Sequence, residues 1–153
     1  MFWNIASLFG TIVTVACAIA SFIAWCKTKK YYHKIILIED IEKIDMALTE
    51  IIKSKEVYNQ ILSIFGDNRG TSEETIKKKY KKIKEHLQNI ETEIPQKFNN
   101  TLDLCREPIG YIDKVIGGQY ECKNSNEFEK LQSNINAIQK DLKAQRDALR
   151  GVK

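Results

Sequence analysis

The sequence is short of the residues that interrupt helices and cross-link chains. Its 153 residues include only two prolines and four cysteines. So little proline, with abundant lysine, glutamate and isoleucine, is typical of a helical protein. Cys17 and Cys26 lie in or beside a long uncharged run, so only Cys105 and Cys122 remain for a disulfide in the charged part. A disulfide framework is therefore excluded as the basis of the fold.

Motifs that carry catalysis are also missing. The sequence has no GxSxG elbow, no Walker-type glycine loop and no HExxH motif. Its two histidines, His33 and His86, are far apart and have no CxxC or HxxxH companion, which disfavours a zinc site. Cys105 fits a small apolar position in a helix seam better than a nucleophile, because no base accompanies it. The sequence therefore predicts a protein that is not an enzyme and that has no metal or cofactor.

Charge is absent from residues 2–26, and this absence is the most informative feature of the chain. Trp3 and Trp25 are 22 residues apart, which corresponds to about 33 Å of helix at ~1.5 Å per residue. This length is close to the ~30 Å hydrocarbon core of a bilayer, with a tryptophan at each interface. A basic flank follows, beginning with Lys27, Lys29 and Lys30. Residues 1–26 are therefore predicted to be a transmembrane anchor.

Cleavable signals are the alternatives for this run. A secretory signal has a basic start, a short apolar core and a small-residue cleavage site. Ala18-Ile19-Ala20 could supply that site, and residues 14–17 faintly resemble a lipoprotein signal, but no basic residue precedes the core and the run stays apolar to Trp25. An uncleaved single-pass helix explains the run better. The lysines that follow predict an outer amino terminus and a cytoplasmic carboxy-terminal domain.

Small residues recur every four positions in the predicted anchor. Such rows let two membrane helices approach closely, so they favour self-association, although alanine and glycine are common in membrane helices in general. The candidate packing residues are Gly10, Ala16, Ala20 and Ala24.

Residues 27–66 are predicted to form a juxtamembrane basic tract and a long helical stem. From Leu37 onward, apolar residues recur at alternating spacings of four and three, the heptad pattern of coiled coils. No glycine or proline occurs between Cys26 and Phe65, so we expect the membrane helix to continue into the stem. The lysine flank is either a simple stop-transfer signal or a contact for anionic lipid. The candidate seam residues are Ile41, Ile44, Leu48, Ile51 and Leu62.

Residues 67–153 are predicted to form a small antiparallel helical bundle. One helix should begin at Thr71, which has Glu74 at capping-box spacing, and should end or kink at Pro95. A short helix between turns is expected over 104–116, and a last helix should follow Asn124. No stretch alternates as a strand would. The fold class is therefore all-α and coiled-coil-like.

Six lysines crowd into residues 77–84. Three interpretations are open: a solubilising surface, a contact for anionic lipid, or a nucleic-acid surface. Nucleic acid is disfavoured because the lysines are accompanied by no arginine forks and no aromatic platform. The six residues are Lys77, Lys78, Lys79, Lys81, Lys82 and Lys84.

These features together predict a single-pass, membrane-anchored and self-associating helical protein. It would act as a scaffold, adaptor or regulatory subunit that tethers a protein assembly to the inner face of the membrane. Its partners would be the lipid bilayer and either further copies of itself or a cytoplasmic protein. The alternative is a membrane-damaging effector of bacterial origin, a holin-like or anti-phage pore former, in which Thr11 and Thr14 give the membrane helix a slightly polar face.

Overall fold

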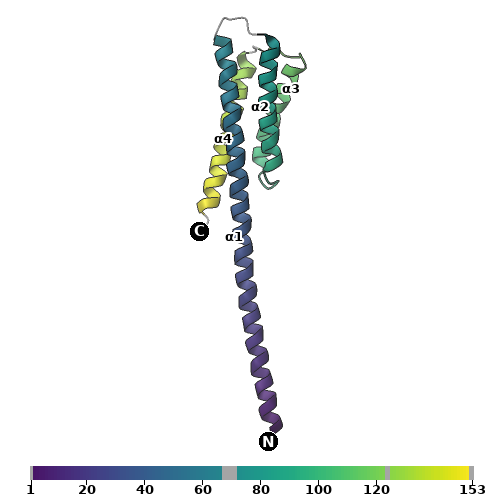
Figure 1. Ribbon diagram of the computed structural model, residues 1–153, viewed down its shortest axis with the longest axis vertical. Helices are drawn as coiled ribbons and strands as arrows, with labels where there is room; N and C mark the ends of the chain where they lie inside the picture. Colours follow the sequence, from purple (N-terminus) through teal and green to yellow (C-terminus); the bar gives the residue numbers. More distant parts are fainter. Residues whose placement is uncertain (1, 67–71, 123–124, 152–153) are drawn as a thin grey trace. The chain divides into compact units, whose positions relative to one another are not determined.

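The computed structural model describes residues 2–66, 72–122 and 125–151, and it describes side chains within these ranges from residue 14 onward, except residue 125. Four helices make up the described chain: α1 (Phe2–Gly66), α2 (Glu73–Glu93), α3 (Asn99–Ile116) and α4 (Ser125–Gly151) (Figure 1). No strand occurs in these ranges. The all-α prediction is confirmed.

The chain divides into two compact units, Met1–Glu39 and Asp40–Lys153. The first unit holds the amino-terminal part of α1, which includes the predicted anchor and the lysine flank. The second unit holds the rest of α1 together with α2, α3 and α4. The division falls inside the predicted stem, not at either of its ends.

Neighbouring helices of the second unit run antiparallel, as polar contacts between them show. Between α1 and α2, Glu50 lies 2.8 Å from His86, and Gln60 accepts a hydrogen bond of 2.6 Å from Lys79. Residue numbers thus rise in one helix as they fall in the other. The pairs Lys84–Asp113 and Glu91–Arg106 show the same order for α2 and α3. The pairs Lys55–Asn136 and Tyr58–Phe128 show it for α1 and α4. The second unit is a four-helix bundle of the up-down kind.

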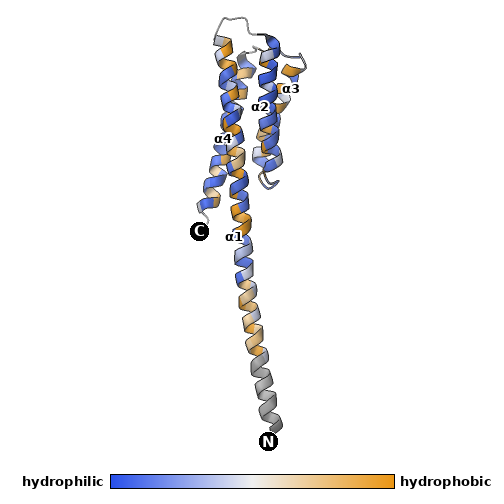
Figure 2. Cartoon of the chain, viewed as in Figure 1, coloured by the Kyte–Doolittle hydropathy of each residue, from blue (hydrophilic) through white to orange (hydrophobic). Residues whose placement is uncertain are grey.

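The core of the bundle takes apolar residues from all four helices. Tyr58 stacks on Phe128 with ring centroids 4.3 Å apart, and the Tyr80 hydroxyl donates a hydrogen bond of 3.1 Å to the carbonyl of Cys122. Hydrophilic residues cover much of the outer surface of α2, so its apolar residues form the stripe expected of a helix on a core (Figure 2). The largest fully buried apolar side chains are Ile44, Ile51, Ile61, Ile83, Leu87, Ile90, Ile112, Leu131, Ile135 and Ile138.

The ends of α2 follow local capping rules. The side chain of Ser72 accepts a hydrogen bond of 3.3 Å from the backbone N–H of Thr75, so the N-cap is Ser72. The predicted cap, Thr71, lies outside the described residues. At the other end, Ile94 is extended, as expected of a residue before proline, and α2 ends there. The prediction that Pro95 ends or kinks the helix is confirmed.

The structure differs from the sequence prediction at α3. Pro108 and Gly110 suggested only a short helix between turns, yet α3 runs through both. Pro108 lacks the N–H that would bond one turn back, a loss that normally weakens a helix interior. Here Cys105 and Ile112, one turn to either side, are fully buried, so packing of this face against the core outweighs the lost hydrogen bond. The helix ends at Gly117, and Gly118 adopts a positive φ of 74°.

Within the described part of the chain, no helix has a segment that is both long enough and apolar enough to cross a membrane. The amino-terminal half of the predicted span, including Trp3 and Gly10, lies outside the residues whose side chains are described.

Candidate interaction surfaces

The first candidate surface is the exposed apolar helix of the first unit. Every residue from 14 to 26 is exposed. Large apolar side chains are among them: Val15 is 53%, Phe22 64% and Trp25 59% exposed. The predicted packing residues Ala16, Ala20 and Ala24 are exposed in the same stretch. A continuous apolar surface of this kind marks a membrane or protein interaction site, because leaving it in water is costly.

The second candidate surface is the basic tract, residues 27–34, which directly follows. All of its residues are exposed. The ammonium of Lys29 lies 5.4 Å from the centre of the Trp25 ring, a cation–π contact. The Thr28 hydroxyl donates a hydrogen bond of 2.9 Å to the Ala24 carbonyl. The structure thus places the predicted interface residues Trp25, Lys27, Lys29 and Lys30 together on one helical stretch.

The predicted stem seam lies inside the bundle and does not form a surface. Ile44, Leu48 and Ile51 are buried, and Ile41 is half-buried. Leu62 departs from the prediction, because it is 48% exposed whereas the adjacent Ile61 is fully buried. Since these residues pack against helices of the same chain, they are not available to a second one.

The seam departs from the predicted spacing because a polar residue occupies one of its positions. Ser54 is fully buried, and the buried positions continue through Tyr58 to Ile61. The predicted alternation takes a step of four from Ile51 to Lys55 and then reaches Tyr58 and Leu62. The buried positions also alternate by three and four, but the step from Ile51 is three, so they run through Ser54 and Tyr58 to Ile61.

Four of the six lysines in the α2 patch contact other side chains of the chain, and three of these contacts are ion pairs with carboxylates. Tyr80 and Ile83 of this segment point into the core, where both are fully buried. Among the described contacts, Lys81 and Lys82 have no partner. The other four lysines pair at 2.6–3.0 Å as Lys77–Glu73, Lys78–Glu74, Lys79–Gln60 and Lys84–Asp113. This arrangement supports the solubilising interpretation of the patch.

A polar cluster between α1 and α2 was not predicted from the sequence. Glu50 accepts hydrogen bonds from Lys53 at 2.6 Å and Asn89 at 3.1 Å, and its other contact is His86 at 2.8 Å. The hydrogen bond from Lys53 is the main cause that lowers the pKa of Glu50 from 4.5 to about 2, and it acts against burial, which raises the pKa. Such a cluster depends on the register between two helices, which no local motif reveals.

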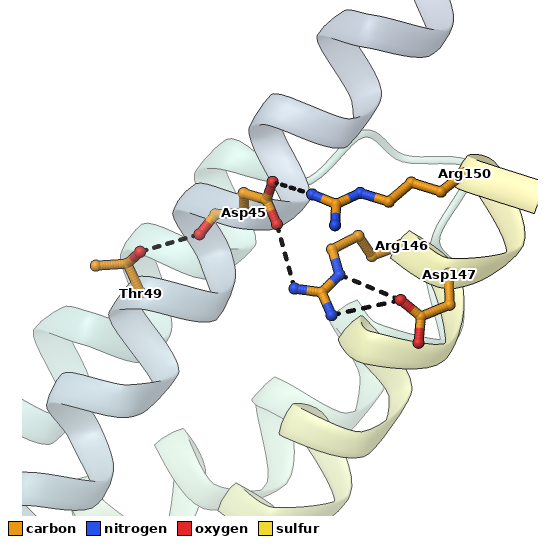
Figure 3. Close-up of polar contacts among 5 residues, drawn as sticks. All are labelled: Asp45, Thr49, Arg146, Asp147 and Arg150. Atoms are coloured by element: carbon orange, nitrogen blue, oxygen red, sulfur yellow. Dashed lines mark hydrogen bonds and ion pairs between the residues drawn. The ribbon is translucent and has the colours of Figure 1, made fainter.

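A second polar cluster joins α1 to the end of α4 (Figure 3). Arg150 donates to the carboxylate of Asp45 at 3.0 Å, and Arg146 lies between Asp45 and Asp147 at 3.6 and 3.3 Å. The Thr49 hydroxyl donates to the backbone carbonyl of Asp45 at 3.0 Å. Both arginines face carboxylates of their own chain, so this cluster holds helices together and leaves no open cationic site.

The buried thiols of the bundle are poor nucleophiles. Burial raises the pKa of Cys105 to about 12 and also raises the pKa of Cys122. Because the thiolate is the reactive form, both groups are kept unreactive near neutral pH. Among the described residues, no group of three or more histidine, cysteine, aspartate or glutamate side chains could hold a metal ion.

Comparison with known proteins identifies no relative: no family model, no curated protein and no solved structure matches this chain.

Proposed function

We propose that this chain is a single-pass membrane protein whose helical bundle serves as a scaffold, adaptor or regulatory subunit at the inner face of a membrane. The observation that carries the proposal is the unbroken exposure of residues 14–26, with their large apolar side chains. These residues continue an uncharged sequence that begins at Phe2. The 25 residues of that sequence correspond to about 37 Å of helix, enough for the ~30 Å core of a bilayer.

The orientation follows from the lysines after the apolar run. Lys27, Lys29 and Lys30 stand within four residues of Cys26. Lysines this close to a membrane helix are retained on the cytoplasmic side. In this orientation the bundle, with its buried thiols of Cys105 and Cys122, lies in the cytoplasm, where free cysteines stay reduced.

In this proposal the membrane helix mediates self-association. The stem seam is buried against helices of the same bundle, so it does not bind a second chain. The row of Ala16, Ala20 and Ala24 is exposed and has the four-residue spacing that allows helices to approach closely in a bilayer. The outer surface of the bundle is then free to bind a cytoplasmic protein.

Substitution within this row tests the self-associating part of the proposal. Ala20→Leu should weaken association of the full chain in a membrane dimerisation assay, because leucine holds the two backbones apart. Ile19→Leu is the matched control, since it changes a neighbouring position on a different face and keeps the side chain large and apolar. Equal signals from the two variants would show that this row of alanines is not the contact between the membrane helices.

The scaffold proposal as a whole is tested by recovery of the full chain in mild detergent. A protein that co-purifies in a constant ratio, while the membrane potential of expressing cells stays unchanged, is the expected result. Rapid depolarisation that requires residues 2–26 would contradict the scaffold and assign the chain to the pore-forming class.

A further inference from the structure

The basic tract carries positive charge that the protein does not neutralise. No ion pair joins Lys27, Lys29, Lys30 or Lys34 to a carboxylate in the described part of the chain. The sequence has no acidic residue before Glu39. The tract therefore presents a local charge of +4, from its lysines alone, on an exposed stretch of helix.

The lysine patch of α2 shows how lysines are paired with acidic residues elsewhere in the chain. There, Lys77 and Lys78 each pair with a glutamate one turn away, at 2.7 and 3.0 Å, and Lys84 reaches Asp113 at 2.6 Å. Lysines that only keep a surface soluble can be paired in this way at little cost. Lys81 and Lys82 of the patch also have no partner among the described contacts, but glutamates stand on the same helix. The basic tract has no acidic residue on its stretch of helix and none of its four lysines is paired within the described ranges, which points to a negative partner outside the chain.

The aromatic residues around the tract indicate the kind of partner. Trp25 precedes it and lies under the ammonium of Lys29, and Tyr31 and Tyr32 within it are 67% and 63% exposed. Tryptophan and tyrosine favour the headgroup level of a bilayer, where the apolar ring contacts lipid and its polar group contacts water. Lysine stems extend along apolar surface and bring their ammonium groups to the same level.

We propose that residues 27–34 bind the headgroups of anionic phospholipids. The inference rests on the proposed function, because the proposed function places the preceding helix in the bilayer. The basic tract then lies at the headgroup layer. Each lysine close to an anionic surface strengthens the association about fivefold. Duplex nucleic acid fits less well, because the tract has no arginine to grip phosphates or base edges in bidentate fashion and continues directly into an uncharged helix.

Lipid retention by the full chain tests this inference. The protein is reconstituted into vesicles of equal parts phosphatidylcholine and phosphatidylglycerol, and the lipids that stay bound after release are counted by native mass spectrometry. The chain should retain phosphatidylglycerol in excess over phosphatidylcholine. Replacing the four tract lysines with glutamine should reduce that excess by about tenfold or more. High salt during release should reduce it too, because ionic screening weakens exposed charge pairs.

The matched control removes the same number of lysines from the patch on α2. Glutamine at positions 77, 78, 81 and 82 should leave the phosphatidylglycerol excess unchanged. Circular dichroism of both variants confirms that the helices persist.

Vesicle flotation separates the headgroup inference from the membrane anchor. A chain that floats with pure phosphatidylcholine vesicles but retains both lipids equally overturns the headgroup inference alone. A chain that floats with neither vesicle overturns membrane anchoring as well. Loss of the lipid excess in both variants, or a tract-dependent gel shift of duplex DNA without lipid enrichment, also rejects the inference.

Discussion

At the scale of single residues, Ser54 is the position where the buried seam of α1 departs most from an apolar pattern. Its side chain is fully buried, and its hydroxyl has no hydrogen-bond partner among the described residues. A buried polar group without a partner loses its hydrogen bonds to water and gains nothing in return. Ser54 is thus a source of instability inside an otherwise apolar layer.

Removing this hydroxyl should make the bundle more stable. We expect Ser54→Ala in the fragment 40–153, which contains all of the buried core, to raise the free energy of unfolding by about 1 kcal/mol. Urea denaturation followed by circular dichroism measures the change. Ile51→Ala, one turn earlier in the seam, is the contrasting variant and should lower the free energy of unfolding by about 2–5 kcal/mol. A destabilising Ser54→Ala would show that the hydroxyl is satisfied in the native bundle.

Glu50 makes the stability of the same fragment depend on pH. Its pKa is about 2 in the folded chain and 4.5 when unperturbed. A carboxylate with a lowered pKa stabilises the fold above its unfolded pKa, and this contribution is lost as the pH falls from 4.5 toward 2. Glu50→Gln should therefore reduce the free energy of unfolding at neutral pH by about 1–2 kcal/mol, and the difference from the parent should vanish near pH 2.

The control for this pH dependence is Glu56→Gln. Glu56 lies on the same helix, is exposed and has no partner among the described contacts. Its substitution should leave the free energy of unfolding nearly unchanged, within about 0.5 kcal/mol, across the pH range. A constant difference between Glu50→Gln and the parent from pH 7 to pH 2 would show that Glu50 acts by packing and not by its charge.

At the scale of the elements, the register of α1 in the bundle is the sharpest prediction. Ile61 is fully buried and Leu62 is 48% exposed, although the two are adjacent and of equal size. Ile61→Ala should therefore cost about 2–5 kcal/mol of stability, whereas Leu62→Ala should cost about 0.5 kcal/mol. Chemical denaturation of the two variants side by side measures the difference. Equal costs, or a larger cost at Leu62, would mean that α1 is rotated relative to the structure.

These elements also show how far the sequence predicts the fold. Apolar spacing and Pro95 located most of the helices because both act within a few turns of one segment, whereas the predicted caps Thr71 and Asn124 lie outside the described residues. Such local signals failed at Leu62 and in α3, where packing against other helices decides which face is buried and whether Pro108 is tolerated. The Glu50–His86 contact joins residues 36 positions apart. It depends on the register between helices, which local pattern does not encode.

At the scale of the whole molecule, the chain combines two units of opposite character. The first unit, Met1–Glu39, exposes apolar and basic side chains over residues 14–35, whereas the unit Asp40–Lys153 buries apolar residues in a core of its own. The lysines differ between the units as well: in the described part of the chain, none of the four lysines of the basic tract is paired with a carboxylate, whereas three of the six lysines in the α2 patch form ion pairs. In the proposed function the first unit provides the anchor and the second the protein-binding surface.

Membrane extraction of a fluorescent fusion tests the central claim most directly. The full chain carries a carboxy-terminal reporter that fluoresces only when it folds in the cytoplasm, and the isolated membranes are washed with alkaline carbonate and returned to neutral pH. The proposed function predicts that fluorescence stays in the washed membranes for the full chain and leaves with the wash for the fusion that begins at residue 40. Fluorescence of the full chain in the wash would contradict the membrane anchor, and membranes that hold the fusion without fluorescence would contradict its cytoplasmic orientation.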